Sequence, residues 1–197
     1  VVDSLKAAAQ ALEIWGDEVF LVISGLVLPD AEEEAIVGFF TARGLPLAVL
    51  TGSVDAIARE RILARPVIDY VLKDNPGSVE YVVWLVRRIA RNRAMTALVV
   101  DDSPSFRRML AELLRLYGFT VLEADDGRQG LALAEAAPRL DLVITDYEMP
   151  GLDGVQLVRR LRASHPRDRL AIIGVSSSQS SQGPISALFI KNGANDY

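Results

Sequence analysis

The sequence predicts an α/β fold, with a doubly wound parallel sheet in each of two domains. Two observations lead to this prediction. Apolar runs of strand length alternate with amphipathic stretches of helix length, which is the pattern of βα units around a parallel sheet. The same order of elements also occurs twice along the 197 residues, and an internal repeat of this length indicates two copies of one domain. We place the two domains at residues 1–95 and 96–197.

The second half alternates strands and helices from its first residues. We expect strands at Ala97–Val100, Thr120–Glu123, Leu140–Thr145 and Ala171–Val175, and helices near Pro104–Tyr117, Gly127–Ala136, Gly154–Ser164 and Pro184–Asn192. The first of these helices has a clear start, because Ser103 is a good N-cap and Pro104 stands where its missing N–H costs nothing. Gly118 is typical of a residue that follows a helix C-terminus.

The first half repeats this order from a later starting point. We expect helices at Leu5–Ile14, Ala31–Arg43, Val54–Ala64 and Val79–Arg93, and strands at Val19–Ser24, Leu47–Leu50 and Val67–Leu72. The repeat is visible in the residues, since 21–29 match 142–150, 48–51 match 173–176, and 69–70 match 196–197. By this alignment the first copy lacks its opening strand and helix, and the second stops before its last strand and helix.

Composition narrows the class of protein. The chain is 50% hydrophobic and 24% charged, with a net charge of −5, which is ordinary for a soluble protein and argues against a nucleic-acid surface. No apolar run reaches the roughly 18 residues of a membrane span, so we expect a cytoplasmic protein without a membrane partner. With no cysteine and one histidine, any metal here is a hard cation held by carboxylates, such as Mg²⁺.

Three carboxylates follow two of the expected strands. Asp101 and Asp102 come directly after one strand, and Asp146 comes directly after another. In doubly wound sheets functional groups gather at the carboxyl ends of the strands. Clustered carboxylates repel one another unless a cation lies among them, and a carboxylate is a competent nucleophile for forming an acyl phosphate. The sequence therefore predicts an Mg²⁺ site that supports phosphoryl transfer, with Ser176 at the end of the next strand as a donor.

The second half resembles the receiver domain of two-component response regulators. The matching segments are VVDDS at 99–103, ITDYEMPGLDG at 144–154, IIGVSS at 172–177 and NGANDY at 192–197. The resemblance implies a flavodoxin-like five-stranded sheet of order 2-1-3-4-5 in each copy. It also implies that Asp146 is the phosphoacceptor, and that Mg²⁺ is bound by Asp101, Asp102, Asp146 and the backbone carbonyl of Glu148.

The same resemblance assigns two switch residues. Ser176 corresponds to the switch hydroxyl and Tyr197 to the switch aromatic. Receivers also carry a lysine three residues beyond the switch aromatic, followed by proline. The chain ends at Tyr197, so we expect the lysine to belong to a longer protein.

The first half resembles the same family but keeps only part of the site. Thr51, Tyr70 and Lys73 stand at the switch hydroxyl, switch aromatic and lysine positions, while Gly25 stands at the phosphoacceptor position. Glycine has no side chain to phosphorylate, and its opening strand, which would carry the acid pair, is missing. We interpret this half as a pseudo-receiver with a role in interaction or homodimerisation. The competing interpretation is phosphorylation at Asp30 or a neighbour.

The resulting hypothesis is a response regulator without turnover chemistry of its own. Asp146 accepts a phosphoryl group from a sensor histidine kinase or phosphotransfer protein, and the change is passed to a C-terminal effector. Tandem receivers with a degenerate first copy resemble the front ends of diguanylate cyclases. The alternatives are a phosphatase of the aspartyl-phosphate type, which Tyr147-Glu148 after Asp146 fits poorly, and an inactive scaffold for protein interaction.

Overall fold

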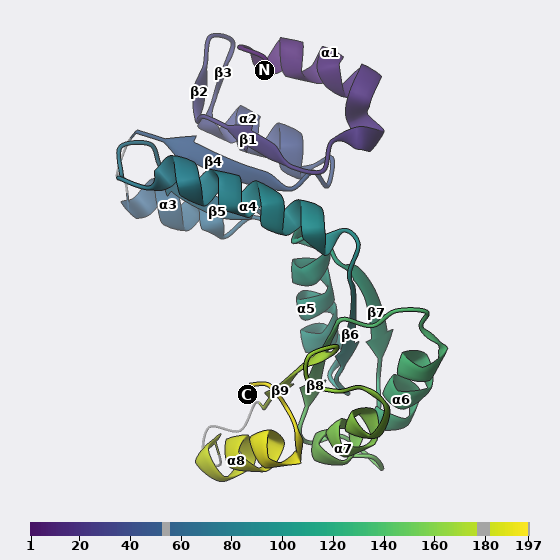
Figure 1. The fold of residues 1–197 in the computed structure, drawn as a ribbon. Helices are drawn as coiled ribbons and strands as arrows, with labels where there is room; N and C mark the ends of the chain where they lie inside the picture. The colour runs from purple at the N-terminus through teal and green to yellow at the C-terminus, as the bar shows by residue number, and fades with distance from the viewer. Residues whose placement is uncertain (53–55, 177–181, 197) are drawn as a thin grey trace. The chain divides into compact units, whose positions relative to one another are not determined.

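The structure is a computed structural model that describes residues 1–52, 56–176 and 182–196. The chain divides into two compact units (Figure 1). Unit 1 comprises Val1–Arg91 with Leu116–Gly118, and unit 2 comprises Asn92–Arg115 with Phe119–Tyr197. Each unit alternates helices with the strands of a parallel sheet, which confirms the predicted α/β class. Within the described ranges, no helix is long and apolar enough to cross a membrane.

Unit 1 is built on a three-stranded parallel sheet of order β1-β4-β5. Its strands are β1 (Val22–Ser24), β4 (Leu47–Thr51) and β5 (Asp69–Leu72), and its helices are α1 (Leu5–Trp15), α2 (Glu33–Thr41), α3 (Ala56–Leu63) and α4 (Ser78–Asn92). The core forms where α2 covers the central strand, because Ile36, Val37 and Phe40 pack with Leu47 and Val49, and none of the five is more than 3% exposed. Burial of these side chains holds the helix to the sheet.

The prediction of a helix over Ala31–Arg43 was wrong at its start. Residues 27–32 instead form an antiparallel hairpin of β2 (Val27–Leu28) and β3 (Ala31–Glu32), and α2 begins at Glu33. The carboxylate of Asp30, in the turn of this hairpin, accepts the backbone N–H groups of Leu5 at 2.8 Å and Lys6 at 2.9 Å. Asp30 thus caps α1, whose free N–H groups would otherwise lack partners.

Unit 2 is built on a four-stranded parallel sheet of order β7-β6-β8-β9. Its strands are β6 (Thr96–Val100), β7 (Thr120–Ala124), β8 (Leu142–Asp146) and β9 (Ala171–Val175), and its helices are α5 (Pro104–Leu116), α6 (Gly127–Ala136), α7 (Gly154–Ser164) and α8 (Gln182–Asn192). In chain order this arrangement is 2-1-3-4. A parallel bridge between Ile173 and Asp196 extends the pairing beyond β9, in the place of the fifth strand of the predicted order.

The central strand of unit 2 carries its core. Residues 97–100 of β6 are at most 1% exposed, and Leu157, Val158 and Leu161 of α7 are equally buried. A strand covered on both faces is expected to be apolar, as β6 is from Ala97 to Val100. Its buried position leaves the residues that follow it, Asp101 and Asp102, at the carboxyl edge of the sheet.

Candidate functional site

Three carboxylates converge at the carboxyl edge of the unit 2 sheet. Asp101 and Asp102 follow β6, and Asp146 is the last residue of the neighbouring strand β8. The two strands pair in parallel, with Val100 opposite Thr145, so their ends lie side by side. One carboxylate oxygen from each of the three residues lies within 4.8 Å of the other two. The predicted convergence of these acids is therefore present in the fold.

Asp101 is fixed by its own backbone and by a nearby arginine. It is only 4% exposed. Its N–H donates to the carbonyl of Ala124 on β7 at 3.1 Å, and one carboxylate oxygen accepts the Ser103 N–H at 2.8 Å. Arg107 on α5 donates to the Asp101 carbonyl at 2.6 Å. These contacts orient a buried carboxylate and place a positive charge next to it.

Asp146 is held by the turn between β8 and α7. The hydroxyl of Thr145 donates to the Asp146 carbonyl at 3.0 Å. The N–H of Tyr147 donates to Val175 of β9 at 3.1 Å, and the N–H of Gly154 donates back to Tyr147 at 3.2 Å. A Cβ at position 154 would collide with the Asp146 carbonyl oxygen, so only glycine lets α7 begin this close to the loop that follows Asp146.

The site is electrostatically unfavourable without a cation. Burial, together with the smaller effects of the charges of Asp101, Asp102 and Glu148, raises the pKa of Asp146 to about 6, against the lowering effect of the Tyr147 N–H. Burial also raises the pKa of Asp101, against the lowering effects of the Ser103 N–H and Arg107. A divalent cation would relieve this repulsion, and carboxylate oxygens are the ligands that Mg²⁺ prefers. The donor set of the cluster therefore fits the predicted metal.

The other predicted residues of unit 2 are placed less completely. Ser176 is half-buried and directly follows β9, the strand that pairs with the strand of Asp146. Glu148 is exposed, two residues beyond Asp146. Tyr197, the predicted switch aromatic, lies outside the described residues. The roles of Arg107 and Gly154 were not foreseen, because both depend on contacts between distant parts of the chain.

In unit 1 the corresponding strand ends carry no carboxylate cluster among the residues described. Gly25 directly follows β1, and Thr51 is the buried last residue of β4. Tyr70 is buried in β5, and Lys73 follows that strand, with its N–H donating to the Thr51 carbonyl at 2.7 Å. The carboxylate of Asp30 is occupied with α1.

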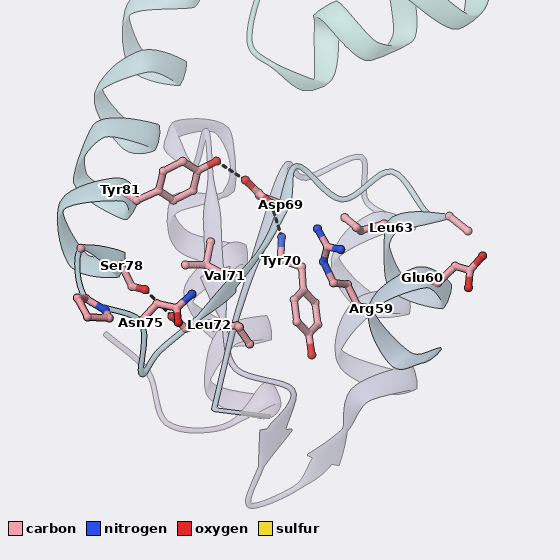
Figure 2. Close-up of a pocket in the computed structure, with 13 residues that line it drawn as sticks. Arg59, Glu60, Leu63, Asp69, Tyr70, Val71, Leu72, Asn75, Ser78 and Tyr81 are labelled. Atoms are coloured by element: carbon pink, nitrogen blue, oxygen red, sulfur yellow. Dashed lines mark hydrogen bonds between the residues drawn. The ribbon is translucent and has the colours of Figure 1, made fainter. Parts of the chain in front are cut away.

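Unit 1 instead has a pocket of about 1080 Å³ between α3, β5 and α4. β5 is an edge strand of its sheet, and Figure 2 shows Tyr81 of α4 pointing toward Asp69 at the start of β5. Asp69 accepts the Tyr70 N–H at 2.7 Å and the Tyr81 hydroxyl, and Ser78 donates to the Leu72 carbonyl at 2.5 Å. The hydrogen bond to Asp69 and burial raise the pKa of Tyr81 to about 12. These side chains occupy the edge of the strand, which protects it from pairing with another chain.

Comparisons with known proteins match unit 2 to a known family. Residues 97–197 match the family model described as the response regulator receiver domain. Chemotaxis protein CheY-3 of Vibrio cholerae is 34% identical over 107 residues, covering 54% of this chain and 80% of that protein. Chemotaxis protein CheY of Pseudomonas aeruginosa is 36% identical over 104 residues, covering 52% of this chain and 82% of that protein.

A solved structure extends the likeness to both units. It is the crystal structure of a putative two-component system response regulator/GGDEF domain protein, 40% identical to this chain with a TM-score of 0.84. The match covers 98% of this chain and 77% of that chain. A cyclic di-GMP phosphodiesterase of Thermotoga maritima is 33% identical over 72 residues, which is 19% of its length.

Proposed function

Because this chain belongs to the response regulator receiver family, we propose that unit 2 accepts a phosphoryl group on Asp146 from a sensor histidine kinase or phosphotransfer protein. The observation that carries the proposal is the set of three carboxylate oxygens within 4.8 Å at neighbouring strand ends. Asp101, Asp102 and Asp146, with the backbone carbonyl of Glu148, would hold Mg²⁺. When bound, the cation neutralises the charge of the phosphoryl oxygens.

In this phosphoryl transfer, Asp146 would be the nucleophile, and Ser176 and Tyr197 would respond to the phosphoryl group. A carboxylate oxygen of Asp146 attacks the phosphorus of phosphohistidine, the phosphorus–nitrogen bond breaks, and its electron pair remains on the histidine ring. The product is an acyl phosphate on Asp146. Ser176, at the end of β9, would donate its hydroxyl to a phosphoryl oxygen, and Tyr197 would move inward as the switch aromatic. The added charge would bias the chain between two arrangements.

The test uses small-molecule donors in place of the kinase. With Mg²⁺ and acetyl phosphate, the wild-type chain should gain the mass of one phosphoryl group, and Asp146→Asn should gain none. Asp125→Asn is the matched control, because Asp125 is an exposed acid directly after β7 and should leave labelling intact. A wild-type chain that neither binds Mg²⁺ nor becomes labelled would refute the proposal and favour an inactive scaffold.

We further infer that unit 1 is a second receiver copy that has lost its nucleophile, with domain bounds at 1–95 and 96–197. The strand registers support this. Ile23 pairs with Ala48, and Ala48 with Asp69, in unit 1. In unit 2, Ile144 pairs with Ile173, and Ile173 with Asp196. These are the same pairs under the sequence alignment 21–29 with 142–150, 48–51 with 173–176 and 69–70 with 196–197.

A repeated hydrogen bond supports the same inference. Ser24 donates its hydroxyl to the Gly25 carbonyl at 2.9 Å, as Thr145 does to the Asp146 carbonyl at 3.0 Å. The loop after the strand is thus held alike in both units, although only one carries a carboxylate. We assign unit 1 an interaction role, with homodimerisation as one form of it.

The output is a proposal that rests on the similar solved structure. That protein's description joins a response regulator to a GGDEF domain, and this chain covers 77% of it. We propose a diguanylate cyclase as the effector controlled by Asp146. The test is cyclic di-GMP formation, with and without acetyl phosphate, by a protein in which this chain is joined to a GGDEF domain.

A further inference from the structure

One arginine in unit 2 binds an unusual set of acceptors. Arg162, near the end of α7, donates from Nε to the carbonyl of Gly193 at 2.7 Å and from Nη2 to Oδ1 of Asn195 at 2.7 Å. Its Nη1 donates to the carbonyls of His165 at 3.1 Å and Leu170 at 2.8 Å. The acceptors come from the end of α7, the residue before β9 and the segment after α8.

Asn195 carries this contact into the sheet. Its Oδ1 also accepts the Ile172 N–H at 2.8 Å, and its own N–H donates to the Ile172 carbonyl at 2.7 Å. One residue later, the Asp196 carbonyl accepts the Gly174 N–H at 3.0 Å. Arg162 and Asn195 therefore pin the chain after α8 to β9.

The residue at position 193 is adapted to the arginine. Gly193 has φ +114°, a backbone conformation that L side chains rarely adopt. A Cβ there would lie 2.8 Å from Cγ of Arg162. Glycine is required both by the turn and by the close approach of this one side chain.

The acceptors of Arg162 are neutral oxygens, so geometry rather than ion pairing decides the interaction. Burial lowers the pKa of Arg162, yet an arginine stays protonated in proteins. Its planar guanidinium presents donors in a fixed fork that reaches several acceptors at once. A lysine ammonium is a single point charge and cannot span the same set.

Unit 1 has no equivalent of this contact at the aligned positions. Continuing the alignment of 21–29 with 142–150 places Thr41 at the position of Arg162, and aligning 69–70 with 196–197 places Ile68 at that of Asn195. The Thr41 hydroxyl donates within its own helix, to Val37 at 2.8 Å. The arginine contact is therefore found in the unit that has the carboxylates and not in the unit that lacks them.

We propose that Arg162 is a positioning residue that couples the segment Gly193–Asp196 to the phosphoacceptor site. The coupling runs through β9, whose Val175 pairs with Asp146 and whose Ile172 and Gly174 pair with the segment. The proposal rests on the proposed phosphorylation of Asp146. Its consequence is that the segment leading to Tyr197 follows the state of Asp146 only while Arg162 holds it to β9.

The experiment measures amide hydrogen exchange at Ile172, Gly174 and Asn195, with and without beryllofluoride and Mg²⁺. Arg162→Ala should accelerate exchange at these amides by about tenfold or more, since hydrogen bonds to a charged group are lost. It should still bind beryllofluoride at Asp146, but the binding should no longer change exchange at Asn195. Arg162→Lys should behave like Arg162→Ala.

Two further variants separate the role from general folding. Asn195→Ala removes one acceptor and should weaken the same coupling if Arg162→Ala fails to fold. Arg160→Ala, an exposed arginine of the same helix, should match the wild type. Wild-type exchange in Arg162→Ala or Asn195→Ala, or full rescue by lysine, would overturn the proposal. Failure of the wild type to bind beryllofluoride would instead refute the proposed function, while the accelerated exchange in Arg162→Ala would still appear.

Discussion

The two units share a frame and differ in charge. Each places a strand end beside a neighbouring strand in the same register, and each holds the following loop with a hydroxyl-to-carbonyl hydrogen bond, from Ser24 in one and Thr145 in the other. At the next residue unit 1 has Gly25 and unit 2 has Asp146. The frame depends on buried apolar strands, whereas the chemistry depends on a few side chains at strand ends. The same strand frame can therefore exist with or without a carboxylate at the strand end.

The units also differ in the kind of site each carries: unit 1 has a pocket and unit 2 has a cluster of carboxylates. Unit 1 has the pocket beside β5, in which the acid Asp69 binds Tyr81 and the strand edge. Unit 2 has an acidic cluster in which burial first, and then the neighbouring negative charges, raise the pKa of Asp146 to about 6. Perturbed carboxylates in a cluster are a better indicator of phosphoryl transfer chemistry than pocket volume is.

The largest expected effect on stability comes from adding a side chain at position 154, against the loop that follows Asp146. Gly154→Ala should destabilise unit 2 by about 3 kcal/mol, because its Cβ meets the Asp146 carbonyl and the turn must open. Mg²⁺ binding should be lost with it. Hydrogen exchange of unit 2 amides measures the first effect and calorimetry the second.

The comparison change in unit 1 is Gly25→Ala, in the loop that follows β1. A Cβ at position 25 has its nearest neighbours at 3.8 and 3.9 Å, which is ordinary contact. Urea unfolding followed by the fluorescence of Trp15 and Trp84, both in unit 1, should shift by less than about 0.5 kcal/mol. If Gly154→Ala and Gly25→Ala lower the free energy of unfolding equally, the loop after Asp146 is not packed more tightly than the loop after β1.

A smaller effect is expected from removing the charge of Asp146. Ionisation of a group whose pKa is raised from 3.8 to about 6 costs stability. The cost grows as the pH rises from 3.8 to 6 and is complete above pH 6, with a ceiling of about 3 kcal/mol. Because Asp146 is partly exposed to solvent, we expect Asp146→Asn to stabilise unit 2 by about 1–2 kcal/mol at pH 7 without Mg²⁺. The gain should shrink as the pH falls from 6 towards 3.8.

Adding Mg²⁺ should make the wild type more stable than Asp146→Asn, the reverse of the order expected without the cation. Wild-type unit 2 should gain stability on adding the cation at pH 7, because the folded state alone assembles the site. Asp146→Asn should gain less, and the wild-type gain should fade below pH 6 as Asp146 takes up a proton. Unfolding followed by hydrogen exchange at several pH values measures both trends. A stability difference that is independent of pH would contradict the raised pKa.

Local signals explain which elements were predictable. Helices α6 and α7 have the bounds predicted for them. The structure shows that their starts are fixed locally, since Asp126 and Asp153 accept N–H groups two or three positions ahead. The hairpin before α2 was missed because the partner of Asp30 lies 25 residues earlier, at Leu5. The acid cluster followed from strand ends alone, since parallel strands bring their carboxyl ends together.

What could not be predicted depends on contacts across the fold. Nothing in the residues near Arg162 indicates that it binds the segment around Asn195, 33 residues later. Asp153 caps the start of α7 whatever residue follows it, and the requirement for glycine at position 154 appears only when the Asp146 carbonyl lies against it. Such contacts decide how tightly a site is held, whereas the choice of chemistry was visible in the strand ends.

The smallest expected effect tests whether unit 1 lacks more than a nucleophile. In the Asp146→Asn background, Gly25→Asp returns a carboxylate to the end of β1, where the open surroundings of Gly25 admit a side chain. Within the described part of unit 1, no group of three acids stands ready to share a cation with it. We therefore expect no Mg²⁺-dependent labelling by acetyl phosphate, within the error of intact-mass measurement. Labelling at residue 25 would mean that the frame and one carboxylate suffice, and the contrast between the units would reduce to a single substitution.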